Sequence, residues 1–172
     1  MKQIRLRSLL TPAFLLSIAP ALTWAAPQPL TVSSEGSKVD FLAVGHPSLL
    51  KIHGESESQV TGQAYLDKKT NTVSGEFEFP LGTLKTGIEK RDEHMKDRYL
   101  QVAQFPKAVL KISDAHTEGP FIGQLTLHGK TLPVSGTLSM TGPLGHAEFK
   151  LKLHDFDIEI PKFAGITVAD EV

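Results

Sequence analysis

Apolar and polar residues alternate along most of the chain after Val39, which is the pattern of half-buried β-strands. The alternation is clearest over residues 73–81, 108–112 and 147–153. Turn-forming residues separate such stretches at intervals of about 8–12 residues, as at residues 141–143. Short strands joined by turns predict an all-β fold, and this pattern leaves open a sandwich or an antiparallel barrel.

Two local features refine the strand pattern. Gly129-Lys130 supplies a short turn between two alternating stretches. After residue 153 the apolar positions change from odd to even numbers, as at Phe156 and Ile158. One extra residue in a strand produces such a change, so the sequence predicts a β-bulge near His154-Asp155.

Residues 86–100 have a helical period instead of a strand period. Ile88, Met95 and Tyr99 share one face, and most other positions are charged. Thr86 and Glu89 have the spacing of a capping box, in which each side chain bonds a backbone N–H of the other's turn. This stretch predicts one short amphipathic helix lying on the β-structure.

The first 25 residues have the layout of a secretory signal peptide. Positive residues such as Lys2 and Arg5 precede an apolar run over residues 9–19, and Thr23-Trp24-Ala25 forms a small-x-small cleavage site. We expect cleavage after Ala25, which leaves residues 26–172 as one exported domain. The later apolar runs are too short to span a membrane, so no transmembrane segment is expected after cleavage.

Charge and cysteine content exclude two classes of function. Lys and Arg number 18 against 19 Asp and Glu, so the net charge of −1 provides no electrostatic footprint for nucleic acid. The chain has no cysteine, which excludes disulfides, thiolate metal sites and a cysteine nucleophile.

The sequence also offers no catalytic constellation. The seven histidines lack the spacing of known metal sites, and His53, His128 and His154 fall on polar strand positions or in turns, where we expect them to be exposed. A Gly-x-Ser-x-Gly motif and a phosphate-binding loop are both missing. The sequence therefore predicts no enzyme activity, no metal and no cofactor.

Three stretches, in this order, resemble the YceI-like family of exported lipid-binding proteins. The first is residues 86–95, TGIEKRDEHM, followed by residues 99–108. The second is residues 123–134, GQLTLHGKTLPV, and the third joins residues 156–158 to residues 163–172, FAGITVADEV. Together they span most of residues 39–172, so their combination is more specific than any one of them.

The resemblance implies a lipocalin-like, eight-stranded antiparallel barrel that binds a polyisoprenoid or another long-chain amphiphilic lipid in the periplasm. An eight-stranded barrel either is filled by side chains or holds one small ligand. A filled barrel is the alternative here, and it would fit a stress-related interaction protein. The expected lining consists of the inward apolar residues Phe41, Phe77, Phe79, Leu110, Ile112, Leu125, Leu127, Leu138, Met140, Phe149, Leu151 and Leu153.

A candidate site for a lipid head group lies on the predicted helix. Arg91, His94 and Arg98 are spaced so that they share one helical stripe. Near a barrel mouth, this stripe would meet a polar or anionic head group. The alternative is a solvated face whose cations are paired with neighbouring Asp and Glu.

The chain departs from the family pattern in two places. Family members usually continue with further alternating apolar residues, so here either residues 166–172 close the barrel or one seam is loosely sealed. Gly54 is followed by Glu55, where many members have an aromatic residue, so we expect a different pocket wall there.

Overall fold

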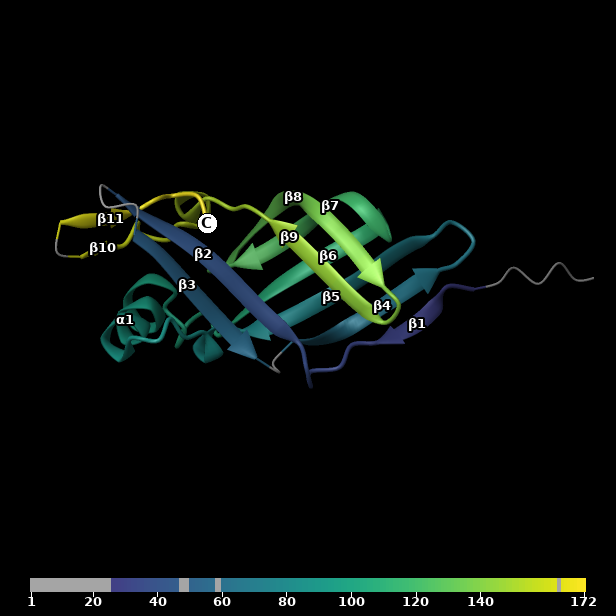
Figure 1. Ribbon diagram of the computed structural model, residues 1–172, viewed down its shortest axis with the longest axis horizontal. Coiled ribbons are helices and arrows are strands. Elements are labelled where there is room, and N and C mark those ends of the chain that lie inside the picture. Colours follow the sequence, from purple (N-terminus) through teal and green to yellow (C-terminus); the bar gives the residue numbers. More distant parts are fainter. Residues whose placement is uncertain (1–25, 47–49, 58–59, 164) are drawn as a thin grey trace, which may run out of the picture.

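The computed structural model describes residues 26–46, 50–57, 60–163 and 165–172, with only the backbone described for Glu57 and Phe163 (Figure 1). The predicted signal peptide, residues 1–25, lies outside the described residues. The strands are Gln28–Thr31 (β1), Lys38–His46 (β2), Leu50–Glu57 (β3), Thr61–Asp67 (β4), Thr72–Pro80 (β5), Lys107–His116 (β6), Glu118–Leu127 (β7), Lys130–Thr141 (β8), Leu144–Phe149 (β9), Lys162–Phe163 (β10) and Ile166–Val168 (β11).

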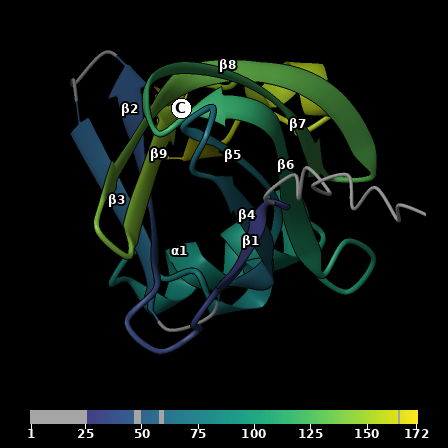
Figure 2. The same cartoon turned by 90° about the vertical axis from the view of Figure 1, so that its right-hand side faces the viewer.

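These strands form two antiparallel sheets. The larger sheet has the order β1-β4-β5-β6-β7-β8-β9, and the smaller has the order β10-β11-β2-β3. Figure 2 shows the larger sheet curling around, with β2 and β3 beside β9 across its open side. The short helix α1, Glu89–His94, lies near the end of the molecule that carries β10 and β11 (Figure 1).

The predicted all-β antiparallel fold with one short helix is confirmed, but the strand count differs from eight. Within the described ranges, no ladder joins β3 to β4 or β9 to β2, so the larger sheet is half a barrel. One reason is that β1 occupies the edge of β4 that β3 would need, with Leu30 opposite Ala64. The other is that β9 ends at Phe149, where the chain leaves β8.

The middle of the curled sheet carries the core. The inward residues of β6 and β7 are buried, as are Val134 and Leu138 on β8. They share one side of the sheet because alternate side chains along a strand face the same way. The short 3-10 helix Leu81–Thr83 (η1) contributes Leu81, which is 2% exposed. Phe156, also 2% exposed, joins this cluster from the C-terminal part of the chain.

The change of apolar phase after residue 153 has a different cause from the predicted bulge, so that prediction is wrong. Residues Leu153–Phe156 form a 3-10 helix, η3, instead of a bulged strand. Asp157 follows with a φ of 55°, and the N–H of Ile158 donates to the Leu153 carbonyl at 3.1 Å. The register does shift between Val73 and Gly75, on β5, which the pattern did not predict.

The turn between β7 and β8 lies one residue earlier than predicted. β7 ends at Leu127 and β8 begins at Lys130, so the two central residues are His128 and Gly129. Their φ values are 50° and 79°, which is the positive-φ pair of a tight hairpin turn that matches strand twist. This position also carries His128 inward, as described below.

Gly136 on β8 is a strand position that has no room for an added side chain. Phe121 and Phe149 flank it on the neighbouring strands, and their rings meet edge to face at a centroid distance of 6.3 Å. A Cβ at Gly136 would lie 2.0 Å from the Glu148 carbonyl oxygen and 2.7 Å from the Phe149 Cβ.

We therefore expect Gly136→Ala to lower the free energy of unfolding by about 1–3 kcal/mol, measured by urea denaturation. The matched control is Gly145→Ala on β9, where an added Cβ meets nothing within 4 Å. We expect that control to stay within about 0.5 kcal/mol of the parent chain. Equal stability of the two variants would contradict the packing described for β8 and β9.

Candidate ligand-binding site

All twelve predicted lining residues belong to the core cluster or pack against it. They divide into two groups by exposure. The five buried residues come from β6, β7 and β8, and they fill the middle of the curled sheet: Leu110, Ile112, Leu125, Leu127 and Leu138. The other seven are half-buried and form what we call the inner apolar surface: Phe41, Phe77, Phe79, Met140, Phe149, Leu151 and Leu153.

Strand glycines allow the phenylalanines of the inner apolar surface to lie close to the backbone. The Phe41 ring on β2 covers Gly54 on β3, its register partner, so that a Cβ there would be 2.0 Å from the ring. The Phe77 ring similarly comes within 2.9 Å of the Cβ position of Gly75. We expected the pocket wall at Gly54 to differ from that of other family members. Here the Phe41 ring of the neighbouring strand forms this part of the wall.

The hairpin of β2 and β3 is joined at one corner to the segment that follows β5. Glu55 and Lys85 exchange two backbone hydrogen bonds of 2.9 Å, each N–H donating to the other carbonyl. Beside them the hydroxyl groups of Ser56 and Thr83 lie 2.6 Å apart, and Ser56 is buried. The side-chain carboxylate of Glu55 forms an ion pair with Lys38 at 3.1 Å.

Residues 166–172 join β2 to the segment after β9, as one of the two expectations for this stretch had it, while β3 and β4 remain unpaired with each other among the described strands. On one side β11 pairs with β2, and the N–H of Ala169 donates to the Val44 carbonyl at 2.6 Å. On the other side Leu151 and Val172 exchange two backbone hydrogen bonds of 2.9 Å. We call residues 166–172 the C-terminal strap.

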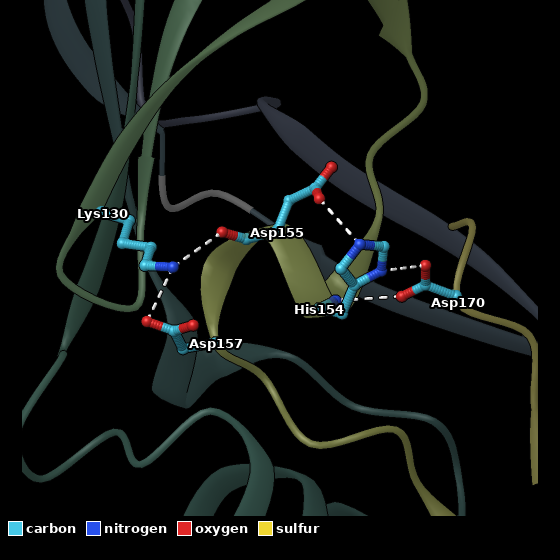
Figure 3. A network of polar contacts seen from close by, with 5 residues as sticks. All are labelled: Lys130, His154, Asp155, Asp157 and Asp170. Carbon is cyan, nitrogen blue, oxygen red and sulfur yellow. Dashed lines mark hydrogen bonds and ion pairs between the residues drawn. The ribbon is translucent and has the colours of Figure 1, made fainter.

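A network of charged side chains fixes the C-terminal strap to η3 (Figure 3). The two ring nitrogens of His154 face two carboxylates: Nδ1 contacts Asp170, and Nε2 lies 2.9 Å from Asp155. Lys130 reaches the same helix through Asp157, at 2.7 Å, and through the Asp155 carbonyl. His154 is exposed, as expected, but it holds two segments together.

The pKa of Asp170 lies below its ordinary value of 3.8, chiefly because its carboxylate accepts a hydrogen bond from the backbone N–H of His154. The His154 ring and Lys152 act in the same direction. A carboxyl whose pKa is lowered by folding stabilises the protein above its unfolded pKa, and this contribution disappears as the pH falls through the folded value.

We expect Asp170→Asn to lower the free energy of unfolding at pH 5–7. The variant should also lack the part of the pH dependence of unfolding that comes from the Asp170 carboxyl. The stability difference from the parent should be constant above about pH 4.5 and shrink below about pH 3.8. Urea denaturation at a series of pH values measures it. A difference that stays the same down to pH 2.5 would show that the Asp170 carboxylate does not act in this way.

The helical segment begins later than its predicted cap, so the capping-box prediction is wrong. α1 starts after Ile88, and Thr86 is separated from it by Gly87, whose φ is 82°. Thr86 instead donates its N–H to Asp92 at 2.7 Å, and its hydroxyl accepts from Arg91. The chain then continues from Met95 to Tyr99 as a π-helix, η2.

The three head-group candidates have different surroundings. Arg91 is half-buried and donates to the Thr86 hydroxyl and carbonyl, each at 2.7 Å. Arg98 is exposed and lies 3.2 Å from Glu159, and its guanidinium lies over the ring of Tyr99. His94 is exposed. The wider turn of η2 begins directly after His94, so the α-helical spacing does not extend to Arg98.

His128 is half-buried, so the expectation that it would be exposed is wrong. Its ring lies 4.4 Å from that of Phe105, and Nδ1 lies 3.0 Å from the Phe156 carbonyl. A carbonyl only accepts, so Nδ1 is the donor in this contact. The Nε2 atom is buried without a hydrogen-bond partner among the described residues.

Two further properties concern the described ranges only. No group of three or more His, Cys, Asp or Glu side chains there is arranged to hold a metal ion. None of the helices there is long and apolar enough to cross a membrane.

Comparison with known proteins gives the family. The sequence model of the YceI-like domain matches residues 30–172. The chain belongs to the YceI-like family. The match covers both sheets, the helical segment and the C-terminal strap of this YceI-like chain.

Curated relatives include UPF0312 proteins of Yersinia pestis (strain Pestoides F) and Yersinia pseudotuberculosis (serotype O:3, strain YPIII). Each is 33% identical over 90 residues, which is 44% of this chain and 47% of the relative. The matched region thus spans about half the length of these relatives.

Two solved structures share the fold. BcnA of Burkholderia cenocepacia has a TM-score of 0.59 at 18% identity, covering 78% of this chain and 90% of BcnA. A polyisoprenoid-binding domain of Saccharophagus degradans, implicated in plant cell wall breakdown, has a TM-score of 0.57 at 10% identity. That likeness covers 85% of this chain and 96% of the domain. At these identities the likeness shows the fold alone.

Proposed function

We propose that this chain is an exported, periplasmic binding or carrier protein for a polyisoprenoid or another long-chain amphiphilic lipid. The observation that carries the proposal is the inner apolar surface, in which four phenylalanines remain half-buried although they pack against the core. Apolar area that stays accessible to water is unfavourable, and covering it with an apolar chain is favourable. The pattern of residues 1–25 supports export, and the family and the polyisoprenoid-binding neighbour support the ligand class.

The energetics favour a long chain over a short one. Each buried CH₂ group contributes about 0.8 kcal/mol, so one isoprene unit contributes about 4 kcal/mol. Association costs about 4–15 kcal/mol in lost freedom, so several units are needed before binding is useful. Affinity should therefore increase with chain length until the inner apolar surface is covered.

The role we propose is non-catalytic. His154, Asp155 and Asp170, which lie together, are bound to each other and hold the C-terminal strap. None of them belongs to the inner apolar surface. A ligand recovered after incubation with the protein should be chemically unchanged.

Equilibrium binding of labelled geraniol, farnesol and geranylgeraniol to the chain beginning at Ala26 tests the proposal. We expect one ligand per chain and a dissociation constant that falls with each added isoprene unit. Failure of all three to bind to folded protein would overturn the proposal and favour a side-chain-filled barrel that acts through a protein partner.

A further inference from the structure

A pocket of about 400 Å³ lies on the outer face of the larger sheet, near the turn between β4 and β5. Tyr65 faces this side because its neighbours Ala64 and Leu66 face the core. Figure 1 shows this turn and β1 at the end of the molecule away from α1. The pocket shares no residue with the inner apolar surface, and its lining is Pro27, Tyr65, Asp67, Thr72, Ser74 and Asp114.

The N-terminal strand brings the start of the mature chain to this pocket. β1 pairs with β4 so that Gln28 is opposite Leu66, and the continuation of this register sets Pro27 opposite Asp67. Both Pro27 and Asp67 line the pocket. Ala26, where we expect the mature chain to begin, is bonded directly to Pro27, and consecutive Cα atoms are about 3.8 Å apart. The amino group that cleavage creates is therefore at the edge of the pocket.

The charged side chains of the lining, Asp67 and Asp114, are both negative. The Asp67 Oδ1 atom accepts from the backbone N–H groups of Lys69 and Thr70, at 2.8 and 3.3 Å, and these bonds are the main reason why the pKa of Asp67 lies below its ordinary value of 3.8. Across the pocket, Asp114 donates its N–H to the Ser74 hydroxyl at 3.1 Å. Its carboxylate has no hydrogen-bond or ion-pair partner among the residues that the structure describes.

The cations nearest in the sequence do not line the pocket. Lys68 and Lys69 belong to the turn after Asp67, and both are exposed. The charge of Lys69 also lowers the pKa of Asp67, so that carboxylate is partly balanced. The ring of Tyr65 is 43% exposed, and the face of an aromatic ring attracts an ammonium group. Two carboxylates beside an aromatic ring favour a small positive group over an anion.

We propose that this pocket binds the α-ammonium group that removal of residues 1–25 creates at Ala26, and that Asp67 and Asp114 are its partners. Before cleavage the Ala26 nitrogen is an uncharged peptide group, so the site acts only in the mature chain. The contact fastens β1 to the edge of β4 that β3 would otherwise need. This inference rests on the export proposed above and adds a role for the processed N-terminus in completing the larger sheet.

Hydrogen exchange of the β1 amides at pH 7, in the chain beginning at Ala26, tests the proposal. Acetylation removes the charge of the N-terminus, so β1 should open more often and its amides should exchange about two- to fivefold faster. In Asp67→Asn/Asp114→Asn, acetylation should make no difference. The control Glu89→Gln/Asp97→Asn removes two negative charges at exposed positions of the helical segment and should respond to acetylation as the parent does.

Both substitutions at the pocket suit the local backbone, so the comparison is made on folded proteins. An asparagine at position 67 keeps a side-chain oxygen that accepts from the Lys69 N–H. Asp114 has a φ of 51°, and asparagine is among the residues that adopt a positive φ most readily. The variant thus loses the two negative charges while the turn and the contact with Ser74 remain.

The reactivity of the terminal amine reports the ion pair directly. A neighbouring carboxylate holds an amine in its charged form, and only the neutral form reacts with an acylating reagent. At pH 7 the Ala26 amine should react about two- to fivefold more slowly in the parent than in Asp67→Asn/Asp114→Asn. Glu89→Gln/Asp97→Asn should react as the parent does, and mass spectrometry of the N-terminal peptide measures each rate.

Three results would overturn the inference. They are an equal effect of acetylation in the parent and in Asp67→Asn/Asp114→Asn, equal amine reactivity in all three proteins, and an exported protein whose first residue is not Ala26. None of them bears on lipid binding, which the series of isoprenoid alcohols measures separately. Failure of that series would overturn the carrier function and leave the N-terminal site in place.

Discussion

A Phe41→Ala/Phe79→Ala double variant is expected to bind geranylgeraniol about 30- to 100-fold more weakly than the parent chain. The two rings come from different sheets, Phe41 from β2 and Phe79 from β5, and both belong to the inner apolar surface. Each half-buried ring contributes about 1–1.4 kcal/mol of apolar contact to a bound chain, and about 1.4 kcal/mol is a factor of ten. Equilibrium binding of the labelled alcohol measures the loss.

The matched control for this variant is Tyr65→Ala, which removes an aromatic ring that is 43% exposed and lies outside the inner apolar surface. Its affinity should equal that of the parent. Unchanged affinity in the double phenylalanine variant, with the protein folded, would mean that the ligand does not cover these rings.

Leu125→Ala is expected to lower the free energy of unfolding by about 2–5 kcal/mol. Leu125 is 2% exposed near the end of β7, between Leu110 on β6 and Leu132 on β8. Truncation removes apolar contacts on both sides and leaves a cavity that the paired strands cannot close. Urea denaturation at neutral pH measures the change.

Ile122→Ala on the same strand is the control for Leu125→Ala, because Ile122 is 74% exposed. Its stability should stay within about 0.5 kcal/mol of the parent. A similar loss in both variants would contradict the assignment of inner and outer faces on β7.

The strand faces were predictable from the sequence because side chains alternate along a strand. This alternation placed Leu110, Leu125 and Leu138 inward, and the structure has them buried. The same pattern did not separate fully buried positions from half-buried ones such as Phe41 and Phe79. That difference depends on where the ladder between strands stops, which is a long-range property.

Three errors have related physical causes. The η3 helix and a β-bulge shift the apolar phase in the same way, so the pattern near His154 did not distinguish them. Thr86 has the spacing of a cap, but the positive φ of Gly87 turns the chain before the helix starts. His128 was placed by its polarity, whereas its hydrogen bond to Phe156, 28 residues away, carries it inward.

The C-terminal strap was the least predictable part of the candidate site. Its contacts join Asp170 to His154 and Glu171 to Lys150, and no local period encodes pairs so far apart in the chain. The available signal was the density of charge, with Asp170-Glu171 following the mostly apolar residues 166–169 and opposite charges at residues 150–155. Only the folded chain shows that these charges meet.

The central claim is that the protein carries a long-chain lipid, and mass spectrometry of organic extracts tests it most directly. The protein should be purified from cells of its own source, without added lipid, and extracted beside an equal amount of the Phe41→Ala/Phe79→Ala variant. The account predicts about one isoprenoid-like molecule per parent chain and much less in the variant. A parent extract free of lipid, and still free after incubation with long-chain isoprenoids, would contradict it.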